Sequence, residues 1–206
     1  KEDEVQFLPS GRQTRIRGIQ LHGQASNVVK AGQRTALNLQ GLDVSEIHRG
    51  VVLTEPGLFE AVSMFDCHLE LLESAPGPIR QRKRIRFHVG TAEIMGYVSL
   101  LGCERLEPGN QSFVQVRLEE PTFALPGDRF IIRQYSPMIT IGGGEILEGN
   151  PRRHRRHDDR VLKRLETFKE GSLDDRLMIL VDEAGLRPLT LERLVGRIGA
   201  VPTTIQ

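Results

Sequence analysis

The densest group of side chains able to do chemistry is a run of arginines and histidines between residues 152 and 157. Guanidinium groups at this density can neutralise phosphates, with binding that weakens as the salt concentration rises. A solvated linker can have the same composition. We therefore expect either a phosphate contact or a basic linker, and the arginines concerned are Arg152, Arg153, Arg155 and Arg156.

Other patterns that could support catalysis or metal binding are weak. His154 and His157 lack a third metal ligand at a useful spacing. Residues 141–145 hold three consecutive glycines but not the Lys-Ser/Thr pair of a phosphate loop, so they indicate a strand that passes close to another backbone or bends at a barrel corner. Cys67 and Cys103 lie in separate apolar stretches and are expected to be buried thiols. We predict no catalytic residue and no metal site.

The elements that would position these residues are mostly strands. Up to about residue 147 the chain consists of short, alternating apolar runs rich in Val, Ile, Phe and Thr, separated by clusters of Gly, Pro, Asn and Asp. Pairs of proline and glycine between the runs indicate tight turns. The strands are predicted at residues 4–8, 14–22, 34–39, 60–72, 84–88, 92–101, 113–118, 129–134 and 138–147.

Helices are predicted after the breaker cluster at residues 149–151, where the apolar period changes from two to about 3.6. Apolar residues between 161 and 168 form one helical face. A second helix opens with Ser172 and Asp175, spaced as a capping box, and a third lies between Thr190 and Gly199. Residues 202–204 look like the entry to a fourth. A helix, a short turn and a second helix start are typical of winged-helix modules, here incomplete.

Composition and charge bound the class of protein. With 206 residues, 38% of them hydrophobic and 27% charged, the chain can bury a core. No apolar run approaches the ~20 residues that cross a bilayer, and the first residues are unlike a signal peptide, so we expect no membrane partner and a cytoplasmic location. Residues 58–149 are net acidic and residues 150–206 net basic. The chain begins without methionine in a predicted strand, so we expect part of a longer protein.

Six segments resemble the selenocysteine-specific elongation factors, a family of translational GTPases of bacteria, in the order that the family requires. Residues 15–24, 31–39 and 48–53 are similar to its second domain, the last of them to that domain's closing strand, and residues 88–93, 128–133 and 140–147 are similar to its third. The glycine triplet in the last segment is the most specific. The helical tail resembles the start of the family's winged-helix region.

The resemblance implies a mainly β fold with two elongation-factor-type β-barrels, the first truncated at its N-terminus, and a small, incomplete winged-helix segment. We place the domains at residues 1–57, 58–149 and 150–206. The resemblance also implies a GTP-dependent factor that delivers selenocysteinyl-tRNA to the ribosome at UGA codons marked by an mRNA hairpin. In the family a G domain binds GTP and Mg²⁺, and the last winged helices hold the hairpin. This sequence lacks the G-domain motifs, so we expect the chain itself not to be an enzyme.

Site residues follow from the same resemblance. Arg34 matches a basic residue of the pocket for the aminoacyl group, where a guanidinium would favour an ionised selenol; a structural salt bridge is the alternative. Five residues fall near positions where related factors meet the acceptor and T-stem backbone of tRNA, although each could equally be a residue of the barrel rim. They are His88, Thr91, Arg133, Gln134 and Tyr135.

Two other functions compete with this interpretation. One is a DNA-binding regulator that joins a winged helix to a β sensor domain, and the other is a different translational GTPase with the same two barrels. Oligomeric state stays open, although the strand edges of a truncated barrel could pair with a second chain.

Overall fold

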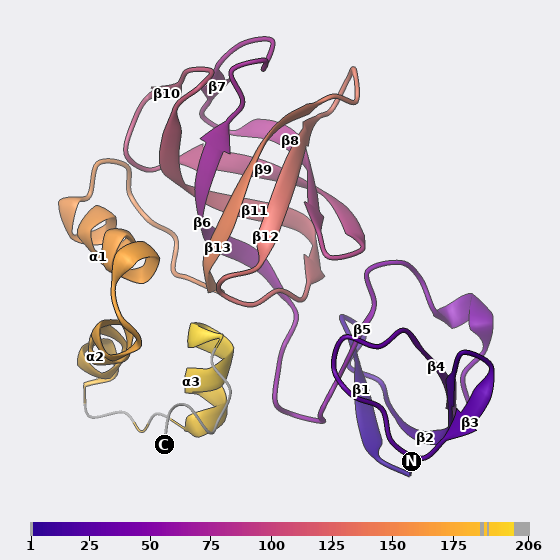
Figure 1. Cartoon of the computed structure of the whole chain (residues 1–206). Coiled ribbons are helices and arrows are strands. Elements are labelled where there is room, and N and C mark those ends of the chain that lie inside the picture. Colours follow the sequence, from indigo (N-terminus) through magenta and orange to yellow (C-terminus); the bar gives the residue numbers. More distant parts are fainter. Residues whose placement is uncertain (1, 186–187, 189, 200–206) are drawn as a thin grey trace. The chain divides into compact units, whose positions relative to one another are not determined.

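The computed structural model describes residues 2–185, 188 and 190–199. The chain forms two compact units, Lys1–Glu60 and Ala61–Gln206 (Figure 1). The fourth helix expected at residues 202–204 lies outside the described residues. Within the described part, none of the helices has the length and apolar character of a membrane span.

The first unit is an open antiparallel sheet around a small core of Phe7, Leu8, Ile16 and Ile19. Its strands pair in the order β3-β2-β1-β5, with β4 also on β2, so the described strands do not close into a barrel. β3 was not among the predicted strands, whereas β5 overlaps residues 48–53, which resemble the closing strand of the family's second domain. The strands are β1 (Glu4–Leu8), β2 (Gln13–Leu21), β3 (Gln24–Ser26), β4 (Thr35–Leu39) and β5 (Val52–Thr54), with a 3-10 turn, η1, at Val44–Glu46.

The second unit contains a closed six-stranded barrel in the order β11-β6-β13-β12-β8-β9. All six strands were predicted, with ends shifted by a few residues. A two-stranded sheet of β7 (Ile79–Arg80) and β10 (Arg105–Leu106) was not. The barrel strands are β6 (Val62–Leu71), β8 (Lys83–Val89), β9 (Ala92–Leu100), β11 (Gln111–Thr122), β12 (Arg129–Gln134) and β13 (Thr140–Gly149).

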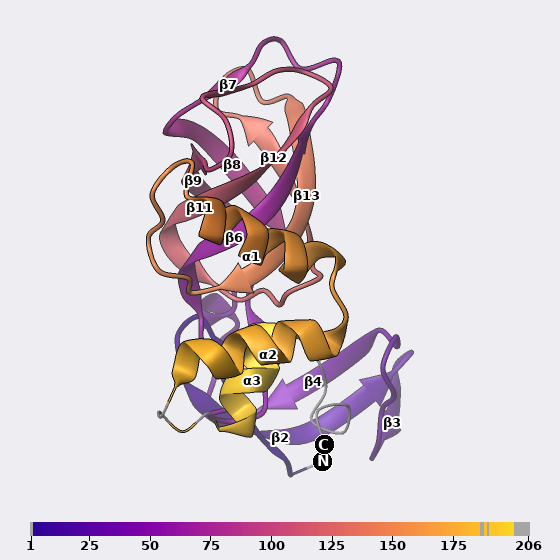
Figure 2. The same cartoon turned by 90° about the vertical axis from the view of Figure 1, so that its left-hand side faces the viewer.

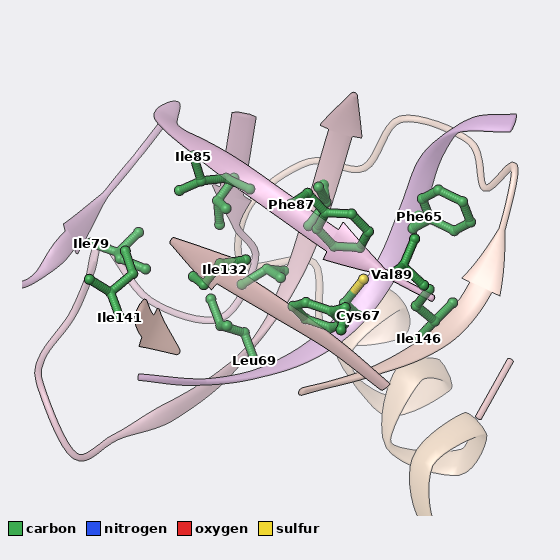
Figure 3. Close-up of a cluster of buried hydrophobic side chains, with 14 of the residues drawn as sticks. Phe65, Cys67, Leu69, Ile79, Ile85, Phe87, Val89, Ile132, Ile141 and Ile146 are labelled. Carbon is green, nitrogen blue, oxygen red and sulfur yellow. The ribbon is translucent and has the colours of Figure 1, made fainter. Parts of the chain in front are cut away.

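The period of two along these strands fills the barrel with apolar side chains (Figure 3). Phe87 stacks between Phe130 and Phe65, with ring centroids 4.9 and 6.2 Å away. Burying a side chain of this size contributes about 1.5–3 kcal/mol. Cys67 is in this core as expected, but Cys103 is only half-buried, so the prediction of a buried thiol is wrong there.

The glycine triplet closes the barrel, as predicted, by letting β13 approach both neighbouring backbones. A Cβ atom at Gly142 would stand 2.5 Å from the carbonyl oxygen of Glu70 on β6, and one at Gly143 would stand 2.6 Å from that of Phe130 on β12. A Cβ at Gly144 would overlap the carbonyl oxygen of His68 on β6. No other residue type fits between the two strands.

The three predicted helices are α1 (Asp159–Glu170), α2 (Leu173–Ala184) and α3 (Leu191–Ile198), and they belong to the second unit (Figure 2). Ser172 and Asp175 form the predicted capping box. Apolar residues of the helices pack on the barrel wall in a second core, which contains Leu101, Leu147, Leu165, Phe168, Leu180 and Ile198.

A buried carboxylate on β13 also joins the helices to the barrel. Glu148 is 1% exposed and accepts hydrogen bonds from Arg164 of α1 at 2.7 Å and from Arg197 of α3 at 2.9 Å. Glu183 of α2 contacts the same two arginines at 2.5 and 3.1 Å. Removing one partner from such a network would leave a buried charge uncompensated, which typically costs about 3–5 kcal/mol, so the network disfavours any other placement of the helices.

The close approach of β13 gives a test of the barrel. Gly144→Ala should lower the free energy of unfolding of the second unit by about 3 kcal/mol, because two backbones must separate to admit the methyl group. Urea unfolding followed by circular dichroism measures this. Gly196→Ala, in α3 with open space around its Cβ position, should leave stability unchanged or raise it by up to about 1 kcal/mol. Equal effects of the two substitutions would contradict the close contact.

Candidate nucleic-acid interface

Several residues that the sequence suggested as tRNA contacts gather on β8 and β12, with His88 and Arg133 on the outer face and Gln134 and Tyr135 at the end of β12. Side chains alternate between the two faces of β8. Ile85, Phe87 and Val89 lie in the core, so the residues between them point outward. Strand pairing then sets Arg86 opposite Arg133, and His88 opposite Ile131.

Tyr135 lies directly after β12 and is 49% exposed. The guanidinium carbons of Arg84 and Arg86 lie 5.0 and 5.5 Å from the centre of its ring, which is within the range of a cation–π contact. Arg133 donates to the carbonyl oxygen of Met138 at 2.5 Å, and Gln134 donates to that of Ser136 at 2.7 Å. These bonds order the loop that holds the aromatic ring. We call Arg84, Arg86, His88, Arg133, Gln134 and Tyr135 the barrel face.

Part of the positive charge of the barrel face is compensated. Arg84 pairs with Glu119 at 2.9 Å, and Arg86 pairs with Glu93 at 2.6 Å. The hydrogen bond from Arg86 lowers the pKa of Glu93 below its usual range. Both pairs are largely solvent-exposed and so contribute little to stability. The face therefore presents fixed hydrogen-bond donors rather than a strong positive field.

Three nitrogen atoms of the barrel face have no partner within the described structure. They are Nε of Arg86, Nε2 of His88 and Nε of Arg133, and each is buried beneath neighbouring atoms. Unpaired buried polar groups are rare in folded proteins because they cost about 1–3 kcal/mol each. Their donor and acceptor capacity is thus left for a partner outside the described residues.

The structure separates the predicted contacts along the barrel. His88 lies near the end of β8, beside the turn that holds Thr91, whereas Gln134 and Tyr135 lie at the other end of the β8–β12 pair. Arg133 is between them. Arg84 and Arg86 were not predicted as contacts, although their alternation with buried Ile85 and Phe87 could have identified them as outward-facing cations.

Arg34 lies in the first unit, just before β4, and is exposed. It forms no ion pair with any described residue, so the structure gives no support to the salt-bridge alternative. The first unit also has a shallow hollow, which is lined not by Arg34 but by residues of β1, β2 and the segment after β4. The lining residues are Glu4, Arg12, Gln13, Thr14, Arg15, Gln40 and Gly41.

The arginine run lies on the surface of the second unit, and all four of its arginines are exposed without an ion pair to the described residues. His154 contacts Asp66 at 2.6 Å and not a second histidine. No group of His, Cys, Asp and Glu within the described ranges could hold a metal ion. Sequence reasoning found this run but not the partner of His154, which is 88 positions away.

Comparison with known proteins agrees with the resemblance found in the sequence. Residues 66–153 match the family model described as "Selenocysteine-specific elongation factor, beta-barrel domain". A selenocysteine-specific elongation factor of Desulfomicrobium baculatum is 36% identical over 192 residues, which are 93% of this chain and 30% of that protein. The chain thus spans about a third of the length of that relative.

A solved structure gives the same result for the fold. The crystal structure of a bacterial selenocysteine-specific elongation factor superimposes with a TM-score of 0.77 and 25% identity, over 98% of this chain and 31% of the other. These matches favour the resemblance over a DNA-binding regulator or a different translational GTPase.

The surroundings of His88 predict its titration. Burial lowers the pKa of His88 below 6.5, Arg133 and Arg86 lower it further, and Glu93 raises it. The unfolded chain therefore binds more protons, and the contribution of His88 to stability is present above about pH 6.5 and declines as the pH falls below it. NMR titration of the imidazole should give a midpoint below 6.5. Glu93→Gln should lower this midpoint and Arg133→Gln should raise it; a shift in the opposite direction for either would contradict the assignment.

Proposed function

The chain belongs to the family of selenocysteine-specific elongation factors, and we propose that it is the tRNA-binding part of a GTP-dependent factor that delivers selenocysteinyl-tRNA to the ribosome at UGA codons. The observation that carries the proposal is the barrel face, where Tyr135 is flanked by two guanidiniums and three polar nitrogens lack partners among the described residues.

The barrel face has the chemistry of backbone recognition. Guanidiniums, an imidazole and an amide on rigid strands can bind phosphate and 2′-hydroxyl oxygens, and such contacts depend on the shape of an A-form helix more than on its sequence. The exposed ring of Tyr135 can pack against a ribose or an unpaired base. We assign the acceptor and T-stem backbone of tRNA to His88, Thr91, Arg133, Gln134 and Tyr135. Arg84 and Arg86 support the aromatic ring, and Arg86 also offers a second phosphate contact beside Arg133.

Arg34 is proposed to face the aminoacyl group. A selenol is more acidic than a thiol or hydroxyl and is ionised at neutral pH, so a fixed guanidinium favours selenocysteine over serine. The exposure of Arg34 and the lack of an ion pair to the described residues leave its charge available for such a ligand.

The other functions are proposed for the whole protein. GTP and Mg²⁺ would bind to a G domain outside these 206 residues, and this chain would not itself catalyse hydrolysis. The ribosome would be a partner, and further winged helices would hold the mRNA hairpin. Because translation takes place in the cytoplasm, we place the protein there.

The barrel face gives a direct test of tRNA binding. In the full-length protein, Arg86→Gln with Arg133→Gln should weaken binding of aminoacyl-tRNAs about tenfold and lower the salt slope of log Kd by about two, because two phosphate contacts are lost. Arg80→Gln with Arg82→Gln removes two exposed charges of the same unit, outside the barrel strands, and is the matched control. Equal binding by the two double variants in a fluorescence titration would contradict the assignment.

Arg34 gives a separate test of selectivity. Arg34→Ala in the full-length protein should bring the Kd for selenocysteinyl-tRNA about tenfold closer to that for seryl-tRNA on the same tRNA body, since a charge-assisted contact contributes about 1.5 kcal/mol. Arg49→Ala, which removes another exposed charge in the same unit, should leave the ratio unchanged. A proportional loss for both tRNAs would show that Arg34 contacts the tRNA body instead.

A further inference from the structure

The basic segment at residues 150–157 is fastened to the barrel along its length. At its start the amide of Asn150 donates to the carbonyl oxygen of Met64 at 2.9 Å, and at its end the amide of His157 donates to that of Leu101 at 2.8 Å. Pro151 is buried. Asp158 then caps α1 by accepting a hydrogen bond from the amide of Arg160.

The middle of the segment is held by a buried polar cluster on the barrel wall. Asp66 on β6 and Gln115 on β11 are directly paired across the two strands. The side chain of Asp66 is fully buried and binds Gln115 at 2.9 Å and His154 at 2.6 Å, while the amide of Gln115 also donates to the carbonyl oxygen of Arg152 at 2.9 Å. We call Asp66, Gln115 and His154 the clamp.

A solvated linker would not require such a clamp. A fully buried carboxylate is costly unless it is paired and hydrogen-bonded, and here both of its oxygens are used to hold residues 152–154. His154 is 12% exposed and points inward, whereas the arginines on either side of it are exposed. The clamp therefore orders the backbone from which these guanidiniums project, which lowers the entropy that they lose on binding a ligand.

The clamped arginines are on the opposite wall of the barrel from the barrel face. In the closed order β11-β6-β13-β12-β8-β9, β6 is three strands from β8, and β11 is three strands from β12. An RNA bound across β8 and β12 would leave Arg152, Arg153, Arg155 and Arg156 free for a second ligand.

We propose that Arg152, Arg153, Arg155 and Arg156, positioned by the clamp, form a second RNA site that binds the phosphate backbone of a duplex other than the one on the barrel face. This proposal rests on the proposed function, because an RNA-delivering factor meets other RNA when it reaches its destination. Guanidiniums recognise phosphate through paired hydrogen bonds. Four of them on one ordered segment suit a ligand with several successive phosphates better than a ligand with a single carboxylate.

The first experiment measures binding of a short RNA hairpin without an aminoacyl group to the full-length protein over a salt series. Arg155→Gln with Arg156→Gln should weaken binding about tenfold and lower the salt slope by about two, whereas the Arg80→Gln with Arg82→Gln control should bind as the unsubstituted protein does. Equal losses for both double variants, or no loss for either, would overturn the site. Equal dependence of polyglutamate binding on Arg155 and Arg156 would overturn RNA as the ligand and indicate an acidic protein.

The second experiment tests the clamp without removing an arginine. In His154→Ala, trypsin should cut after Arg152, Arg153, Arg155 and Arg156 about tenfold faster, because cleavage follows local opening, and the hairpin should bind more weakly. Gln115→Met, which removes only the amide, should have a smaller effect of the same kind if His154→Ala does not fold. Unchanged cleavage and unchanged binding in a folded variant would show that the clamp does not position the arginines.

The two proposals fail separately. The proposed function is supported if the barrel-face double variant loses aminoacyl-tRNA binding. This inference is overturned if, at the same time, the Arg155/Arg156 double variant binds the hairpin as well as the control does. The reverse pattern would keep the second site and overturn the assignment of the barrel face.

Discussion

The contact on which the second unit depends is the passage of β13 between the backbones of β6 and β12. Only glycine permits carbonyl oxygens this close to Cα, so residues 142–144 decide whether the six strands can form a closed barrel. Closure then sets β12 beside β8 and brings Arg86 opposite Arg133. The donors of the barrel face are rigid because the strands beneath them have no free edge.

The outer wall on the other side is organised by two buried carboxylates. Asp66 and Glu148 are paired across β6 and β13, and each binds side chains from the chain that follows the barrel. His154 forms a hydrogen bond with the first, and Arg164 and Arg197 form ion pairs with the second. Buried ion pairs add little net stability over apolar packing, but a misplaced partner is costly. The pairs therefore specify where the turn and the helices dock, while the second apolar core supplies the attraction.

Features set by neighbouring residues were predictable from the sequence. The long strands follow from alternation, the capping box from the spacing of Ser172 and Asp175, and the close approach of β13 from its glycines. Strands of two or three residues, such as β3 and β7, were missed because two or three side chains are too few to show an alternating pattern. The pairing of His154 with Asp66 was also missed, since only the folded barrel brings residues 88 positions apart together. Spacing likewise could not show that Gln134 and Tyr135 lie at one end of the β8–β12 pair, with His88 and the turn that holds Thr91 at the other.

The bonds from Glu148 to α1 and α3 have a mechanical consequence. Segment 150–158 is hydrogen-bonded to the barrel at both ends and in the middle. Glu148, just before the segment, is bound to α1 and α3, so the connection contains no free hinge. Sideways displacement of the helices must carry β13 with it. β13 also pairs with β12, with a register shift between Ile132 and Arg133, so a single strand links the docked helices to the wall that bears Arg133.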